Sequence, residues 1–132
     1  MPEFPALTHV AVTVSDLTRS TPWYAALFDA TPALDEDVDA GGFHHTVFAI
    51  GGGQLFGLHQ HFDKAGGAFD EHSPGLDHVS FGCADRSELE GWVKRLDDLG
   101  YAHGGIIDAH YGSGLSFRDP DGIALEFFAP PS

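Results

Sequence analysis

The sequence is poor in cysteine and in positive charge. Of its 132 residues only Cys83 is a cysteine, so no disulfide can form within the chain, and we expect a reducing, cytoplasmic location. Lysine and arginine number 6 against 20 acidic residues, which gives a formal net charge of −14. This balance argues against nucleic acids and anionic membrane surfaces as partners, because both attract clustered positive charge.

Long apolar runs are missing as well. No stretch approaches the roughly 20 apolar residues that cross a bilayer. Residues 1–7 combine neither a basic region nor an apolar run, so we expect no secretory signal peptide. The chain is instead rich in glycine, with 17 residues, and in histidine, with nine. Because histidine is the commonest metal ligand, the positions of the histidines are the first place to look for function.

The chain repeats itself at an offset of 69 residues. A histidine, a tryptophan and two aspartates recur in one register, which chance does not readily produce. We therefore expect one domain, 1–132, made of module one (1–65), a linker (62–75) and module two (75–130). The matched pairs are Leu7 and Leu76, His9 and His78, Val10 and Val79, Asp16 and Asp85, Trp23 and Trp92, Leu27 and Leu96, and Asp29 and Asp98.

The residue pattern of each copy predicts a βαβββ unit, and two such units make an α+β fold. The first strands, 7–14 and 76–83, alternate apolar residues with a histidine and small residues. A helix should cover the apolar face, and the opposite face should line a cavity. The helices begin at Asp16 or Thr18 and at Asp85 or Ser87, which are good N-caps. The remaining strands are expected at 32–38, 43–50 and 54–61, and at 101–107, 113–118 and 122–128.

The candidate site residues follow from this repeat. If the two units pair about a pseudo-twofold axis, His9 and His78 converge on one cavity. Glu126 lies between two core residues of its strand, so it faces the same side as the histidines. Aligning Leu58 with Leu125 places His59 opposite Glu126. His61 shares the face of His59 and is the alternative, and the roles of His45, His110 and Tyr111 stay open.

These side chains suit a divalent metal ion. Two histidines and one carboxylate with open positions are typical of non-haem iron. With His59 as a further ligand, the set His9, His59, His78 and Glu126 also suits zinc, nickel or manganese. The type of ligand alone does not choose among these four metals.

The chain resembles the vicinal oxygen chelate superfamily over nearly its whole length. The resemblance is carried by the duplicated unit, by His9, His78 and Glu126, and by the stretch Asp119-Pro-Asp-Gly-Ile-Ala-Leu-Glu-Phe. That superfamily includes glyoxalase I, extradiol dioxygenases, fosfomycin-resistance proteins and bleomycin-binding proteins. The resemblance implies a curved, cleft-forming mixed sheet, with a metal held from strands one, five and eight. At the end of strand four glyoxalase I usually has a glutamate, and this chain departs from that pattern with His59.

The resemblance also implies what the protein does. We expect a metal-dependent enzyme that acts on a small substrate with adjacent oxygens, either as a glyoxalase-like lyase or isomerase or as a ring-cleaving dioxygenase. Glu126 is the candidate catalytic residue for proton transfer. The alternative is a non-enzymatic resistance protein of the bleomycin-binding type, for which an acidic chain suits a cationic drug. We expect a homodimer in either case.

Overall fold

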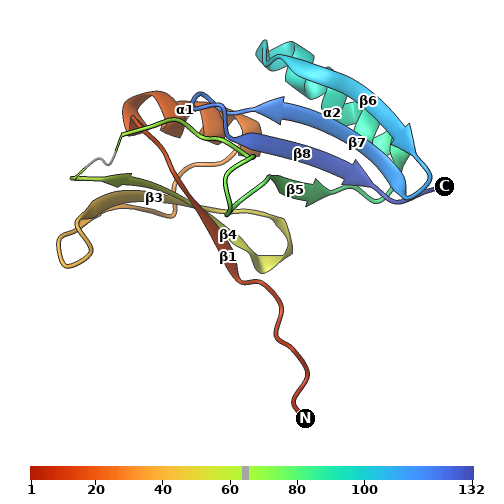
Figure 1. Cartoon of the computed structure of the whole chain (residues 1–132). Helices are drawn as coiled ribbons and strands as arrows, with labels where there is room; N and C mark the ends of the chain where they lie inside the picture. Colours follow the sequence, from red (N-terminus) through yellow and green to blue (C-terminus); the bar gives the residue numbers. More distant parts are fainter. Residues whose placement is uncertain (64–65) are drawn as a thin grey trace. The chain divides into compact units, whose positions relative to one another are not determined.

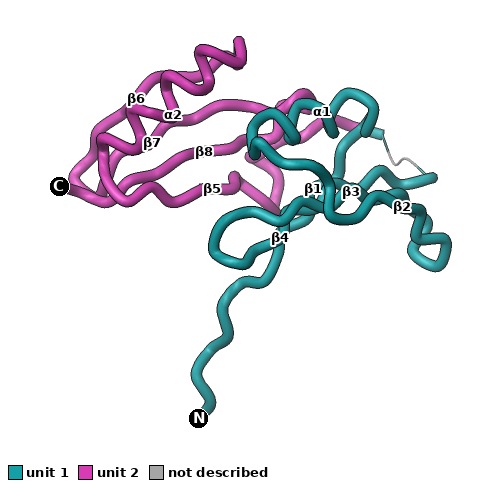
Figure 2. Tube along the Cα trace, turned by 180° about the vertical axis from the view of Figure 1, so that it is seen from behind, with its two compact units in different colours: residues 1–66 teal, residues 67–132 magenta. Residues whose placement is uncertain are grey.

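The computed structural model describes residues 1–63 and 66–132 (Figure 1). The chain divides into two compact units, Met1–Gly66 and Gly67–Ser132 (Figure 2). The predicted modules are 1–65 and 75–130, so unit 1 ends one residue after module one and unit 2 begins eight residues before module two. The predicted linker 62–75 crosses the boundary between them, and its residues Lys64 and Ala65 lie outside the described residues.

Both units have the predicted element order. Unit 1 contains β1 (His9–Thr13), α1 (Leu17–Phe28), β2 (Leu34–Val38), β3 (Phe43–Ala49), the short 3-10 helix η1 (Gly51–Gly53) and β4 (Leu55–His61). Unit 2 contains β5 (Val79–Gly82), α2 (Arg86–Leu99), β6 (His103–Ala109), β7 (Gly112–Arg118) and β8 (Ala124–Ala129).

Each unit folds its strands into a four-stranded mixed sheet. The order is β1-β4-β3-β2 in unit 1 and β5-β8-β7-β6 in unit 2. The pairs β1–β4 and β5–β8 are parallel, and the other neighbours are antiparallel. The predicted α+β class with two βαβββ modules is therefore confirmed.

The strand registers fix how the two copies correspond. Ala11 pairs with Gly57 in unit 1, and Ser80 pairs with Glu126 in unit 2. Both members of the second pair lie 69 residues after those of the first. The bounds of β3 and β7 differ by the same offset at both ends. The copies therefore correspond without any gap through their last strands.

This correspondence corrects one prediction. The alignment of Leu58 with Leu125 requires a two-residue gap, and the registers contain none. The strand-four counterpart of Glu126 is therefore Gly57, and His59 is not opposite Glu126 in the repeat.

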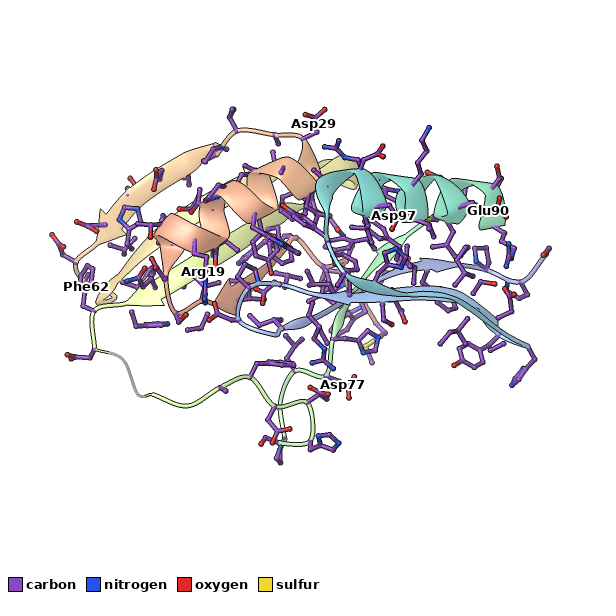
Figure 3. The ribbon with its side chains drawn as sticks, turned by 90° about the horizontal axis from the view of Figure 1, so that it is seen from above. Arg19, Asp29, Phe62, Asp77, Glu90 and Asp97 are labelled. Atoms are coloured by element: carbon purple, nitrogen blue, oxygen red, sulfur yellow. The ribbon has the colours of Figure 1, made fainter. Side chains whose placement is uncertain are left out.

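Equivalent aspartates start the two helices. The side chain of Asp16 accepts a hydrogen bond from the Thr18 N–H at 3.0 Å, and that of Asp85 accepts one from the Glu88 N–H at 2.9 Å. Each bond satisfies one of the N–H groups that a helix leaves without an internal partner. Helix α1 ends at Asp29, labelled in Figure 3, in the left-handed conformation with φ of 49°. Neither α-helix of the described chain has the length and apolar character needed to cross a membrane.

Each helix covers one face of its own sheet. Tyr24 and Phe28 of α1 both contact Phe56 of β4, with ring centroids 5.3 Å apart in each case. In unit 2, Trp92 of α2 stacks on Phe127 of β8 at 4.2 Å. The predicted apolar face is thus the face that the helix covers. We call the opposite face of each sheet its distal face, and side chains alternate between the two faces along each strand.

Candidate functional site

His78 and Glu126 come together at the parallel pair β5–β8 of unit 2. His78 immediately precedes β5. Glu126 lies in β8 between Leu125 and Phe127, whose side chains are buried against the helix side. Strand alternation therefore puts Glu126 on the distal face. Nε2 of His78 lies 3.7 Å from Oε1 of Glu126.

A hydrogen bond fixes each of these two side chains. Oδ1 of Asp77 lies 2.7 Å from Nδ1 of His78, and the Ser80 hydroxyl donates to Oε1 of Glu126 at 2.8 Å. An ionised carboxylate can only accept, so the contact with Asp77 places a ring proton on Nδ1 of His78. In the neutral imidazole the lone pair is then on Nε2, the nitrogen that lies close to the Glu126 carboxylate.

The spacing of these two atoms fits a shared divalent ion. Histidine nitrogens and carboxylate oxygens lie about 2.0–2.2 Å from such an ion, so two ligand atoms of one ion are at most roughly 4.4 Å apart. The observed 3.7 Å falls within that limit. Within residues 1–63 and 66–132, no three or more His, Cys, Asp or Glu side chains are already gathered as a metal cluster. Unit 2 thus brings together two candidate metal ligands.

A glycine in β7 makes room for the Glu126 carboxylate. A Cβ atom at Gly114 would lie 3.0 Å from Oε2 of Glu126 and 3.5 Å from its Cδ. A glycine inside a strand often marks such a close approach by another group. The missing side chain at Gly114 therefore lets the carboxylate lie over the neighbouring strand.

Unit 1 repeats part of this arrangement around His9. Nδ1 of His9, in β1, lies 2.9 Å from the hydroxyl oxygen of Thr8. Thr8 precedes Asp77 by the repeat offset, so the preceding residue engages the same ring nitrogen in both copies. A hydroxyl can donate or accept, whereas an ionised carboxylate only accepts. The Thr8 contact therefore permits either tautomer of His9.

His59 extends toward the position that corresponds to Glu126. That position is Gly57, and a Cβ atom there would lie 3.7 Å from Nε2 of His59. Gly57 and His59 lie two residues apart in β4, so they share a face of the sheet. The imidazole therefore lies beside the place where the unit 2 copy carries its carboxylate. The counterpart of His59 itself is Phe128.

Other rings pack around His59. Its ring centroid lies 4.3 Å from that of Phe43, 5.6 Å from that of His45 and 6.2 Å from that of His61. Burial, and then the charges of His45, His61 and His9, lower the pKa of His59 below its ordinary value of 6.5. The neutral imidazole is the form that binds metal ions, so this environment favours a ligand role.

The other candidate residues of unit 1, His45 and His61, lie on the same face of the sheet as His59. His61 is exposed one pleat further along β4 than His59. Nε2 of His45 lies 3.3 Å from Oε1 of Glu36 on the distal face. The neighbouring His44 points to the opposite face of the sheet and is bound by the carboxylates of Asp35 and Asp37 in β2.

The remaining candidates lie in unit 2, between β6 and β7. Tyr111 is 65% exposed, and its ring stacks on Phe128 with centroids 6.2 Å apart and planes 14° apart. His110 contacts Tyr111 edge to face at 5.3 Å. Phe128 shares the parity of Glu126, so these rings border the face that carries the carboxylate.

Sequence reasoning missed the residues that support the candidate ligands. Thr8 and Asp77 could have been found, since each directly precedes a matched histidine. Ser80 lies at the position of Ala11 and carries a hydroxyl where the first copy has only a methyl group. The role of Gly114 depends on the path of the Glu126 side chain across β7, and no sequence pattern indicates that path.

Comparison with known proteins places this fold in a large family. The family model described as "Glyoxalase/Bleomycin resistance protein/Dioxygenase superfamily" matches residues 6–127. A curated relative, "Putative ring-cleaving dioxygenase MhqA" of Bacillus subtilis (strain 168), is 39% identical over 49 residues. That match spans 37% of this chain and only 16% of the relative, so it compares a short segment of each protein.

Solved structures extend the likeness over nearly the whole chain. A glyoxylase/bleomycin resistance protein/dioxygenase domain from Frankia sp. EAN1pec has a TM-score of 0.87 and 31% identity, covering 98% of this chain and 95% of that one. A mutant of the fosfomycin resistance protein FosX from Listeria monocytogenes, complexed with Mn(II) and 1S,2S-dihydroxypropylphosphonic acid, has a TM-score of 0.69 and 18% identity, covering 98% and 95%. The second likeness shows the fold alone. The match of the family model over residues 6–127 shows that the chain belongs to the Glyoxalase/Bleomycin resistance protein/Dioxygenase superfamily.

Proposed function

We propose that this protein is a metal-dependent enzyme that acts on a small substrate with two adjacent oxygens. The single observation that carries the proposal is the approach of His78 Nε2 to Glu126 Oε1, with a hydrogen bond holding each group. The reaction is that of a glyoxalase-like lyase or isomerase, or that of a ring-cleaving dioxygenase. The name of the Bacillus relative supports the second reaction over the matched segment.

In unit 2, His78 and Glu126 would hold the divalent ion, and in unit 1, His9 and His59 are the further proposed ligands. When bound, an iron, zinc, nickel or manganese ion acts as a Lewis acid toward the substrate oxygens. The Mn(II) complex of the FosX mutant supports a divalent ion in a protein of this fold. At Gly57 this chain has no side chain to act as a second carboxylate ligand, and the nearby imidazole of His59 takes that place.

Glu126 is the proposed proton-transfer residue, with a histidine or tyrosine of the same face as the alternative. Its Oε1 accepts a hydrogen bond from Ser80, and its Oε2 faces the gap at Gly114. A carboxylate held in this way can accept a proton from a substrate carbon or hydroxyl, and a positioned general base contributes about 10²- to 10⁴-fold in rate. Ser80 orients the carboxylate for that transfer.

Metal analysis and thermal unfolding test the proposal together. The purified protein should contain about one divalent ion per chain. Adding that metal to chelator-treated protein should raise the melting temperature, because a ligand at a hundredfold over its Kd stabilises the folded state by about 2.7 kcal/mol. His78→Ala should abolish the rise. His72→Ala is the matched control, since the His72 side chain is exposed and contacts the carboxylate of Asp70, which supports no candidate ligand.

A non-enzymatic drug-binding protein of the bleomycin-binding type is the second candidate. The net charge of −14 favours it, because an acidic protein attracts cationic drugs. On that reading no metal raises the melting temperature, and a cationic drug binds wild type and Glu126→Gln equally well. Metal-dependent stabilisation that Glu126→Gln weakens would exclude it.

We also propose that the protein is a homodimer in solution, because proteins of this family often form dimers. Sedimentation equilibrium at micromolar concentration should give twice the chain mass of 14.1 kDa. A clean monomer would contradict this part of the proposal alone.

A further inference from the structure

The two candidate histidines at equivalent positions are held by chemically different neighbours. His78 is bound at Nδ1 by the carboxylate of Asp77 at 2.7 Å, and His9 is bound at Nδ1 by the hydroxyl of Thr8 at 2.9 Å. The first contact permits one tautomer and the second permits two. The two copies therefore differ in how firmly the preceding residue orients the histidine: Asp77 fixes the ring of His78, and Thr8 constrains that of His9 less.

The segment that carries Asp77 is anchored to the second sheet. Arg118, at the end of β7, donates to both carboxylate oxygens of Glu71, at 3.0 and 2.9 Å, and to the Gly122 carbonyl at 2.9 Å. The hydrogen bond to Glu71, and then the charges of Glu71 and Asp77, raise the pKa of Arg118. Asp77, labelled in Figure 3, is thus one of two carboxylates whose charges act on the anchored Arg118 guanidinium.

We propose that Asp77 is a positioning residue for metal binding. Its carboxylate keeps the ring proton of His78 on Nδ1 and turns the lone pair of Nε2 toward Glu126. Thr8 is a weaker version of the same device for His9. The inference rests on the proposed function, because it assumes that His78 and Glu126 hold a divalent ion.

The expected size of the effect follows from the chemistry of the contact. A carboxylate on the second ring nitrogen fixes the tautomer and raises the basicity of the metal-binding nitrogen, and losing such a partner costs about 10- to 100-fold in metal affinity. The hydroxyl of Thr8 selects neither tautomer, so part of the His9 population has the proton on Nε2. His78 is therefore the better organised ligand of the two.

Four variants test this assignment. Asp77→Asn removes the charge while keeping the shape, and Asp77→Thr installs the residue of the first copy. Thr8→Asp performs the reverse exchange in unit 1. The matched control is Asp70→Asn, because Asp70 bonds Nδ1 of His72 at 3.0 Å in the same loop and supports no candidate ligand.

Two measurements on each variant separate positioning from general stability. Ring nitrogen chemical shifts of His78 in the metal-free protein report the tautomer, and competition titration with Zn²⁺ reports Kd. We expect wild-type His78 to have the proton on Nδ1, and Asp77→Asn and Asp77→Thr to give mixed tautomers with Zn²⁺ affinity about 10- to 100-fold weaker. Thr8→Asp should fix the tautomer of His9 and tighten binding, and Asp70→Asn should change neither quantity.

The outcomes distinguish this inference from the function beneath it. If wild-type protein binds Zn²⁺ and the Asp77 variants keep both the tautomer and the affinity, Asp77 has no positioning role and the proposed function stands. If wild-type protein binds no divalent ion, the proposed function fails and this inference fails with it. Should the Asp77 variants not fold, a wild-type His78 that shows mixed tautomers in the metal-free protein would still overturn the assignment.

Discussion

The replacement Gly57→Ala separates stability from metal binding at one position. Gly57 lies inside β4 and its φ is not positive, so an alanine can adopt the same backbone conformation without strain. The new Cβ would lie 3.6 Å from Cβ of Ala11 and 3.7 Å from Nε2 of His59, which is ordinary van der Waals contact. A compatible Gly-to-Ala change stabilises a protein by about 0.4–1 kcal/mol, chiefly by reducing the entropy of the unfolded chain.

The same methyl group should weaken metal binding. The methyl group would occupy the space beside Nε2 of His59. It would hinder a metal ion from reaching that nitrogen and would restrict rotation of the imidazole. We expect the free energy of unfolding in urea to rise by about 0.4–1 kcal/mol. On the proposed function, the Kd for Zn²⁺, measured by calorimetric titration, should rise about tenfold or more, comparable to the loss of a supporting group.

A matched variant makes the result decisive. Gly82→Ala makes the same change at the end of β5, where φ is not positive and a new Cβ would have no neighbour within 4 Å. It should stabilise the protein similarly and leave the metal Kd unchanged. If Gly57→Ala leaves metal affinity at the wild-type value, His59 is not a ligand from this direction. If it destabilises the protein instead, the space beside Gly57 is not free.

Three further predictions concern the fold that holds the site. Nδ1 of His44 lies 2.7 Å from Asp37 and Nε2 lies 2.5 Å from Asp35, and the hydrogen bond to Asp35 is the main cause that raises the pKa of His44 above 6.5. The protonated His44 therefore stabilises the fold fully below pH 6.5, and this stabilisation is lost as pH rises through the higher pKa of the folded state. His44→Gln should thus lower the free energy of unfolding in urea at about pH 5.5 and leave it nearly unchanged at about pH 9. An equal loss at both pH values would contradict this. Leu89→Ala, in a fully buried position of α2, should cost about 2–5 kcal/mol in urea unfolding, and a loss below about 1 kcal/mol would show that the α2 core can collapse around the gap. Asp85→Ala should cost about 0.5–2 kcal/mol by removing the N-cap of α2, and a neutral result would mean that water replaces the cap.

The sequence was sufficient to predict the duplicated unit. Matched aspartates at 16 and 85 cap the two helices, and matched apolar residues lie on the faces that those helices cover. These features are local or periodic, so composition and spacing reveal them. The placement of Glu126 on the distal face of its sheet follows from the same alternation and agrees with the structure.

The correspondence of the last strands could not be predicted in the same way. A shift of two residues preserves the alternation of faces, so hydrophobic patterning cannot distinguish a gap of two from no gap. Matching Leu58 with Leu125 gave apolar residues the correct parity, and matching Phe56 with Leu125 does so equally well. Only the backbone pairing of β4 with β1 decides between them, and it selects Phe56, which is 1% exposed like Leu125. The supporting contacts of Asp77 and Ser80 depend on side-chain rotamers, which sequence periodicity does not determine.

The duplication offers each site position twice, and the chain fills the two copies differently. Ser80 and Glu126 form a hydrogen-bonded pair in unit 2, while Ala11 and Gly57 at the same positions in unit 1 have no polar side-chain atoms. A buried or half-buried carboxylate needs a hydrogen-bond partner, so the hydroxyl and the carboxylate are useful only together. The same reasoning explains why both are missing from unit 1, where His59 reaches the empty position from two residues away. The two copies thus differ in charge at equivalent positions: unit 2 has the carboxylate of Glu126, and unit 1 has the imidazole of His59 beside Gly57.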